Sequence, residues 1–184
     1  MKSKTNKEVE FEIQSGRIIV TDPCYKLDTG CTKVLKVKNG IWAAEAEYIN
    51  HKFESCTEEY TCIKALHAWH SDFLSIKDIH PHRTAHDIGV DSGQAGFFDF
   101  EKYKQAKAIN PKDDWDGKGG HYDQCCNTTC DTPERFGATS CGVVSATGCG
   151  DGSYSLYYDT NNENEAVRLY LEFIPDDNIS EELE

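Results

Sequence analysis

The clearest pattern of apolar and polar residues lies in the last third of the chain. Apolar side chains at alternate positions from Val167 to Phe173 are separated by polar ones, among them Arg168 and Glu172. A period of two is the signature of a half-buried β-strand, because successive side chains point to opposite faces. The segment 153–158 alternates in the same way, and turn-forming residues separate the two. The pattern therefore predicts a long β-hairpin.

Similar runs predict strands in the rest of the chain. They cover residues 9–13, 17–20, 33–38, 41–49, 60–69, 73–76, 87–98 with a turn at Ser92-Gly93, and a buried stretch from Cys141. Asn39-Gly40 is a strong signal for a type I′ turn, which needs positive φ at both positions. We therefore expect 33–38 and 41–49 to pair as a hairpin. For 60–69, a short helix over 62–69 is the alternative.

Two stretches predict short helices. Asp99 can cap a helix that runs to about Ala108 and ends before Asn110-Pro111, and a second helix runs from His121 to about Cys130. Small residues such as Gly96 indicate close approach of another backbone or a ligand.

With about eight or nine strands and two or three short helices, the sequence predicts a β-rich α+β fold built on a mainly antiparallel sheet or sandwich. We expect a single domain over 1–184, with frayed tails at 1–8 and 176–184.

Charge narrows the possible partners. The 184 residues include 19 Lys and Arg against 32 Asp and Glu, a net charge of −13. Such a surface repels phosphate backbones, so we expect neither nucleic-acid nor membrane binding, whereas solubility or a basic partner is compatible with it. No apolar run is long enough for a membrane span, and the N-terminus lacks a signal-peptide core. Nine cysteines, an odd number, fit thiols in a reducing compartment, and we expect a cytoplasmic protein.

Histidines form one candidate metal site. His80, His82 and His86 give the spacing H-x-H-x3-H, and imidazole is a common zinc ligand. The spacing differs from H-x-H-x-D-H of the β-lactamase type of metallo-hydrolase, because Ala85 occupies the position before the last histidine. We expect a surface loop there, and no metal or other cofactor.

The cysteines near residue 125 leave three interpretations open. A structural zinc site usually has two C-x2–4-C knuckles, which this region lacks. Cys126 is a candidate nucleophile, with His121 or Asp123 as base and the amides of 150–153 as oxyanion donors. The simplest interpretation is that each thiol is a small buried apolar group.

The glycine-rich loop at 148–153 can turn successive amides toward an anion or a carbonyl oxygen. It lacks the lysine and the following helix of a phosphate-binding loop, and a strand follows instead. A tight turn between strands uses the same residues.

Five motifs occur in a fixed order along the chain. They are Thr21-Asp22-Pro23-Cys24-Tyr25, Gly89-Val90-Asp91-Ser92-Gly93-Gln94-Ala95-Gly96, Tyr122-Asp123-Gln124-Cys125-Cys126, Gly142-Val143-Val144-Ser145 and Gly150-Asp151-Gly152-Ser153-Tyr154. The set resembles a bacterial and phage family of unknown function, domain-of-unknown-function number 4241, and its short phage-borne relatives. The resemblance covers the chain from Arg17 to Ile174. It implies a β-rich single domain, a cytosolic setting and residence in phage or mobile elements, and it supplies no reaction. The chain departs from the relatives in the H-x-H loop and at Ser155, where they often have Pro.

The matching positions are polar residues in loops, beside small residues. If the sheet brings these loops to one end, they form a concave acidic site that suits hydrogen-bond donors, such as an amine, a base edge, sugar hydroxyls or a partner's Lys and Arg. The candidate ligand-binding residues are Asp22, Tyr25, Asp91, Gln94, Asp99, Gly150, Asp151, Gly152 and Ser153. The alternative is that the aspartates only cap turns.

Three functional hypotheses follow. The first is a non-enzymatic protein of phage or mobile-element type that binds a small ligand or a host protein through the acidic site. The second is a cysteine-dependent hydrolase or transferase that uses Cys126. The third is a structural or immunity-type interaction protein without a pocket. The oligomeric state is left open.

Overall fold

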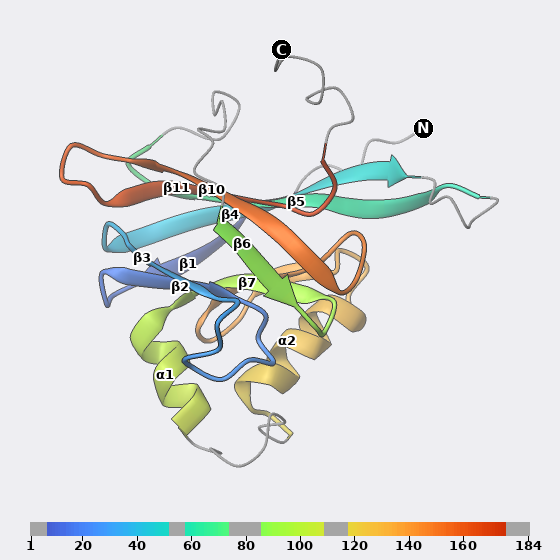
Figure 1. Cartoon of the computed structure of the whole chain (residues 1–184), viewed down its shortest axis with the longest axis horizontal. Helices are drawn as coiled ribbons and strands as arrows, with labels where there is room; N and C mark the ends of the chain where they lie inside the picture. Colours follow the sequence, from blue (N-terminus) through green and yellow to red (C-terminus); the bar gives the residue numbers. More distant parts are fainter. Residues whose placement is uncertain (1–6, 52–57, 74–85, 109–117, 176–184) are drawn as a thin grey trace.

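The computed structural model describes residues 7–51, 58–73, 86–108 and 118–175, and in these ranges two antiparallel sheets pack face to face (Figure 1). Sheet A contains, in spatial order, β1 (Val9–Ile13), β4 (Gly40–His51), β5 (Tyr60–His70), β11 (Ala166–Glu172), β10 (Gly152–Thr160) and β6 (His86–Val90). Sheet B contains β3 (Lys33–Lys36), β2 (Arg17–Thr21), β7 (Gln94–Asp99), β9 (Gly142–Ala146) and β8 (Phe136–Ala138).

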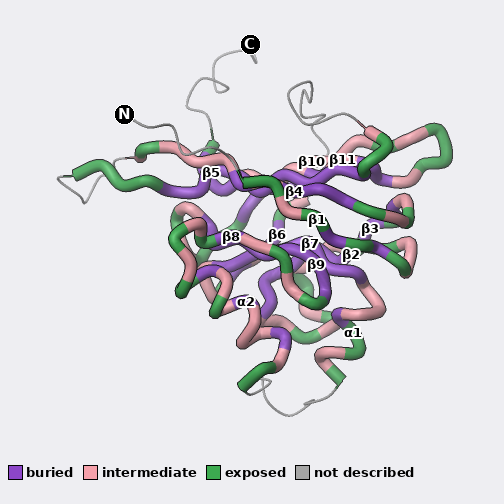
Figure 2. The backbone as a smooth tube through the Cα atoms, turned by 180° about the vertical axis from the view of Figure 1, so that it is seen from behind, coloured by how far each residue is buried: buried purple, intermediate pink, exposed green. Residues whose placement is uncertain are grey.

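The main core lies between the two sheets, where the tube of Figure 2 is mostly buried. Alternation along the strands supplies it: Leu169 and Leu171 of β11 are fully buried in this core, while Arg168 and Tyr170 belong to the outer face of sheet A. The predicted hairpin is confirmed, because β10 pairs with β11 in antiparallel register. The prediction of a β-rich α+β fold with a mainly antiparallel sandwich is confirmed as well.

Two helices cover the outer face of sheet B. The helices α1 (Phe100–Ala108) and α2 (His121–Cys130) follow the predicted bounds closely. Between them and the sheet lies a second apolar cluster, in which Phe98, Tyr103 and Cys125 are fully buried.

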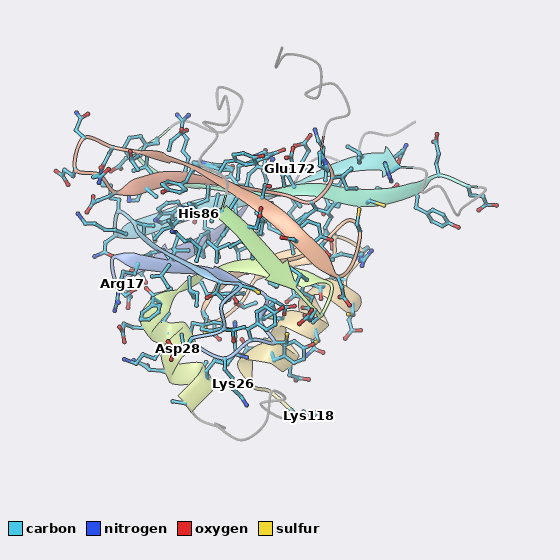
Figure 3. The ribbon with its side chains drawn as sticks, in the orientation of Figure 1. Arg17, Lys26, Asp28, His86, Lys118 and Glu172 are labelled. Carbon is cyan, nitrogen blue, oxygen red and sulfur yellow. The ribbon has the colours of Figure 1, made fainter. Side chains whose placement is uncertain are left out.

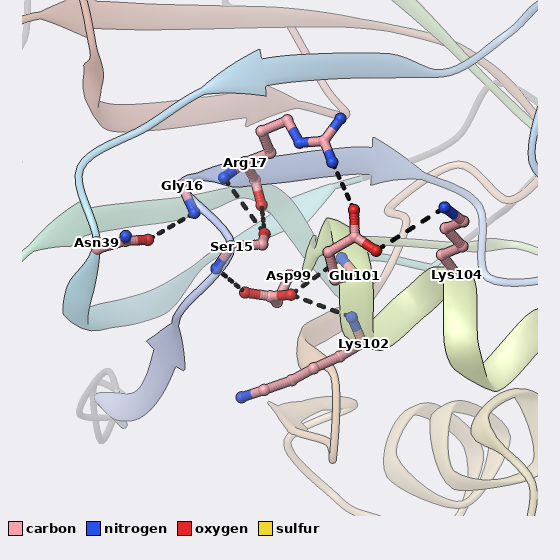
Figure 4. Close-up of polar contacts among 8 residues, drawn as sticks. All are labelled: Ser15, Gly16, Arg17, Asn39, Asp99, Glu101, Lys102 and Lys104. Atoms are coloured by element: carbon pink, nitrogen blue, oxygen red, sulfur yellow. Dashed lines mark hydrogen bonds and ion pairs between the residues drawn. The ribbon is translucent and has the colours of Figure 1, made fainter.

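Asp99 joins α1 to the β1–β2 turn. Its Oδ1 accepts the amides of Glu101 and Lys102 at 3.1 Å each, so it caps the helix as predicted. Its Oδ2 accepts the amide of Gln14 at 2.8 Å and that of Ser15 at 2.9 Å, and Figure 4 shows the bond from Ser15. Burial alone would raise the pKa of Asp99, but the donating amides outweigh burial and hold the pKa below its usual value.

The hairpin predicted around Asn39-Gly40 is wrong. β3 pairs with β2 in sheet B, whereas β4 pairs with β1 and β5 in sheet A, so the chain passes from one sheet to the other at this point. Gly40 has positive φ and Asn39 does not. Tertiary bonds decide the geometry: the Gly16 amide donates to Asn39 Oδ1 at 2.6 Å (Figure 4), and the Lys38 amide donates to the Ala166 carbonyl.

The remaining elements agree with the pattern or lie outside the described ranges. Residues 60–69 are part of strand β5, so the helical alternative for 62–69 is wrong. The predicted strand 73–76 and the predicted frayed ends extend beyond the described residues. None of the described helices is long and apolar enough to cross a membrane.

Gly96 lies where the backbone of β9 approaches β7. A Cβ at this position would be 2.4 Å from the Val143 carbonyl oxygen and 2.3 Å from the ring of Phe98. Only a residue without a side chain fits there, as the run of small residues predicts.

We expect Gly96→Ala to lower the free energy of unfolding by about 1–3 kcal/mol, because the sheet must shift to admit the methyl group. Urea unfolding followed by circular dichroism measures this. The control is Gly30→Ala, since no atom lies within 4 Å of a Cβ at Gly30. Equal stability of the two variants would contradict the close packing.

Candidate functional site

Four segments meet at the end of the sandwich where β2 ends and β7 begins. They are the β2–β3 loop (residues 22–32), the β6–β7 turn (91–93), the β9–β10 loop (147–151) and the first turns of α2 (Figure 1). Antiparallel pairing brings them together: Thr21 lies opposite Gly96, and Gln94 lies opposite Ala146. We call this end of the molecule the loop rim.

Asp22 holds the loop rim together. Its side chain is fully buried, and both carboxylate oxygens are used. Oδ2 accepts the amides of Asp91 and Ser92 at 2.8 and 2.7 Å, and Oδ1 accepts the Ser92 hydroxyl at 2.6 Å and the Cys24 amide at 2.8 Å. Asp22 therefore caps the β6–β7 turn from a distant loop, and its carboxylate serves the protein rather than a ligand.

Asp91 and Asp151 are exposed acidic residues of the loop rim that lie close together. Val90 pairs with Gly152, so the residue after Val90 and the residue before Gly152 are neighbours at the end of sheet A. The β9–β10 loop also packs on the β6–β7 turn, because the Thr147 amide donates to the Gly93 carbonyl at 2.9 Å. The structure thus brings the predicted acidic and glycine-rich loops together.

A pocket opens between the β2–β3 loop and the β6–β7 turn. Its volume is about 250 Å³, and it is lined by Cys24, Tyr25, Lys26, Thr29 and Asp91. Burial and a hydrogen bond with Asp91 raise the pKa of Tyr25, so the phenol keeps its proton and donates to the carboxylate. Asp91, Tyr25 and Thr29 thus supply acceptor oxygens to the lining, and Lys26 adds one ammonium group.

The pocket thiol, Cys24, is held in its protonated form. Burial, together with the negative charge of Asp22, raises the pKa of Cys24 to about 12. A thiol with such a pKa is almost entirely protonated near neutral pH and is a poor nucleophile.

Gln94 joins β7 to α2 from a buried position. Its Oε1 accepts the Thr129 hydroxyl at 2.9 Å, and its Nε2 donates to Cys126 Sγ at 3.5 Å. Tyr122, one helical turn before Cys126, hydrogen-bonds with Ser92 and with Cys126, and burial raises its pKa to about 12. Sequence reasoning missed Tyr122, although it begins the motif that contains Cys126.

The described contacts pair His121 with Cys125 and not with Cys126. His121 Nε2 lies 3.8 Å from Cys125 Sγ, and both side chains are buried beneath the helix. Asp123 instead accepts the Gly119 amide at 2.7 Å. Gly152 and Ser153 are exposed and lie opposite β6 in sheet A. These contacts therefore do not connect Cys126 with His121 or Asp123, the two bases that the nucleophile hypothesis requires.

Asp99 lies apart from the other candidates. Gln94 and Asp99 are the two ends of β7, roughly 16 Å apart at the rise of an extended strand. The carboxylate of Asp99 is buried and caps α1. The prediction that Asp99 belongs to the same site as the residues of the loop rim is therefore wrong.

Within the described ranges, no group of three His, Cys, Asp or Glu side chains is placed to hold a metal ion. His80 and His82 of the H-x-H loop lie outside those ranges.

The comparisons with known proteins place the chain in a family. A family model described as "Protein of unknown function (DUF4241)" matches residues 11–171, which include the whole loop rim. The chain belongs to this family. No curated protein and no solved structure matched it. The resemblance inferred from the motifs is confirmed, and the link to phage-borne relatives stays a prediction.

Four of the five motifs include residues of the loop rim, and hydrogen bonds of Asp22, Gly93 and Gln94 connect these segments. Segments far apart in the sequence are thus fixed to one another by hydrogen bonds between buried or half-buried groups.

We expect Asp22→Asn to destabilise the protein by about 3 kcal/mol, because Asn has one acceptor oxygen where Asp22 has two, so two of the four donors then face an NH₂ group. For a chain of this size that corresponds to a fall in Tm of about 6–12 °C. Differential scanning calorimetry measures it, with exposed Asp151→Asn as control. If the two variants melt together, Asp22 does not hold the loop rim.

We expect iodoacetamide at pH 8 to alkylate exposed Cys31 and Cys130 well before Cys24, because a pKa of about 12 leaves about one thiolate in ten thousand. Peptide mass spectrometry over a time course gives each rate. The same experiment tests the nucleophile hypothesis: Cys126 reacting faster than Cys130 would favour an enzyme.

Proposed function

We propose that this family member is a non-enzymatic binding protein that holds a small amine-bearing ligand in the pocket of the loop rim. The observation that carries the proposal is the pocket lined by Tyr25, Asp91 and Thr29, whose position depends on the bonds made by Asp22. A pocket on a rigid sheet scaffold, with a few convergent polar groups, is the usual form of a small-molecule site.

The lining favours a ligand that donates hydrogen bonds. Asp91 supplies an exposed carboxylate, and the hydrogen bond from Tyr25 orients it. An ammonium group can donate a charge-assisted hydrogen bond to this carboxylate, and such a bond is stronger than one between neutral groups. The volume of about 250 Å³ lies just below the range of pockets for drug-sized ligands, so the ligand is small, such as an amino acid, an amino sugar or a short polyamine.

Several observations support binding over catalysis. Cys24, the thiol that lines the pocket, has a raised pKa, and His121 contacts buried Cys125. The polar groups near Cys126 tie it to the scaffold, since Gln94 donates to its sulfur while accepting from Thr129. These contacts give Gln94 and Tyr122 a positioning role.

We also propose that the protein works in the cytoplasm and is encoded by a phage or another mobile element. None of the eight cysteines in the described ranges is in a disulfide, as expected in a reducing compartment. The phage association rests on the resemblance of the motifs.

We expect at least one member of a panel of amino acids, amino sugars and polyamines to raise the Tm. A ligand at 100 times its Kd adds about 2.7 kcal/mol of stability, which corresponds to about 5–10 °C for this chain. Isothermal titration calorimetry on the best ligand then measures the Kd. We expect Asp91→Asn to weaken that binding at least about tenfold, because the charged acceptor is lost.

The matched control is Asp131→Asn, which removes the same charge from an exposed position after α2. Binding by the control should equal that of the wild type. A panel without any stabilising member, or equal binding by the Asp91 variant and the wild type, would contradict the proposal.

A further inference from the structure

The loop between β9 and β10 is pressed against the backbone of β5. A Cβ on Gly148 would lie 2.3 Å from the Ile63 carbonyl oxygen and 2.7 Å from the Ile174 side chain, so only glycine fits at this position. β9 belongs to sheet B and β10 to sheet A, so the loop crosses from one sheet to the other. The crossing is therefore fixed to the part of β5 that contains Ile63.

The end of β11 closes this contact from the other side. β11 ends at Glu172, which lies in sheet A beside β5 (Figure 3). The next two amides, those of Phe173 and Ile174, donate to the Lys64 carbonyl at 2.7 and 3.0 Å. These bonds hold the Ile174 side chain against Gly148. The β9–β10 loop is thus packed between two segments of sheet A.

Two cysteines flank the contact. Cys62 precedes Ile63 in β5, and Cys149 follows Gly148 in the loop. Both are free thiols; Cys62 is buried in the core between the sheets, whereas Cys149 is exposed. The Cα atoms of a disulfide lie roughly 4.4–6.8 Å apart, so its two residues must belong to segments that approach one another as closely as these two do.

The ionisation of the two thiols is linked. Burial raises the pKa of Cys62, the negative charge of Cys149 raises it further, and the guanidinium of Arg135 acts in the opposite direction. Burial also raises the pKa of Cys149. Because Cys62 ionises against the charge of Cys149, Cys149 is the first of the two to lose its proton. Exposure and earlier ionisation both make Cys149 the thiol that an oxidant reaches first.

We propose that Cys62 and Cys149 are a redox-active pair, which a peroxide converts to a disulfide that fastens the β9–β10 loop to β5. In the first step the Cys149 thiolate takes one oxygen from hydrogen peroxide and becomes a sulfenic acid, while the other oxygen leaves as water. In the second step the Cys62 sulfur attacks the Cys149 sulfur and loses its proton, and the sulfenic oxygen leaves as water. Two thiols and one peroxide thus give one disulfide and two waters.

The raised pKa values determine when the pair reacts. Both thiols are protonated near neutral pH, so the pair stays reduced in a reducing compartment until peroxide is in excess. Exchange with a small thiol then reduces the disulfide again. The disulfide would also tie the loop rim to β5, because the Thr147 amide of the same loop donates to the Gly93 carbonyl. The pair does not depend on the function proposed for the pocket.

The test treats the full-length protein with excess hydrogen peroxide and then blocks the remaining thiols with N-ethylmaleimide. Digestion without a reductant, followed by peptide mass spectrometry, identifies the linked cysteines. We expect one linked pair, Cys62 with Cys149, which dithiothreitol separates again. Calorimetry should show that the link raises the Tm by about 5–15 °C, because it closes a loop of roughly 90 residues in the unfolded chain.

Cys149→Ser removes the first thiol of the pair, and Cys130→Ser is the matched control because Cys130 is exposed as well. Before oxidation, both variants should melt with the wild type. After oxidation, we expect the control to form the same link with the same rise in Tm, and Cys149→Ser to show neither. A link from Cys149 to any other cysteine overturns the proposal. So does a Cys149 sulfinic acid beside a free Cys62 thiol, or a link between two chains in non-reducing electrophoresis.

Discussion

The loop rim depends on one buried carboxylate. Asp22 accepts four hydrogen bonds, from its own loop and from the turn between β6 and β7, which lies about 70 positions further along the chain. A buried charge is tolerated only where such donors surround it, so the two loops must meet in this arrangement or expose an unsatisfied ion. The wall of the pocket, formed by Tyr25 and Asp91, follows directly from that requirement.

Local patterns predicted most strands and both helices, because alternation and capping are properties of neighbouring residues. Asn39-Gly40 failed because its conformation is decided by Gly16 and Ala166, which no local pattern contains. Local reasoning predicted that Asp99 caps α1, but it did not predict that Asp22, an equally buried acceptor, joins two distant loops of the loop rim. The motifs can be recognised in the sequence, but which of them contact one another depends on the strand pairing.

The outer faces of the two sheets differ in composition because the described helices cover only one of them. α1 and α2 bury Phe98 and Cys125 on the outer side of sheet B, which gives that sheet apolar side chains on both faces. Sheet A keeps polar residues on its outer side, where Glu47, Lys64 and His67 form one cluster. Position in the layers thus explains why polar side chains are kept on the outer side of sheet A, whereas sheet B is apolar on both sides.

The strand order also has a kinetic consequence. Five of the nine strand pairs join strands that are not consecutive, and Leu66 of β5 meets Leu171 of β11 more than 100 positions away. Closing such long loops costs chain entropy before any contact offsets it. The fold therefore has a high contact order, and we expect it to fold more slowly than a domain of similar size with mostly local contacts.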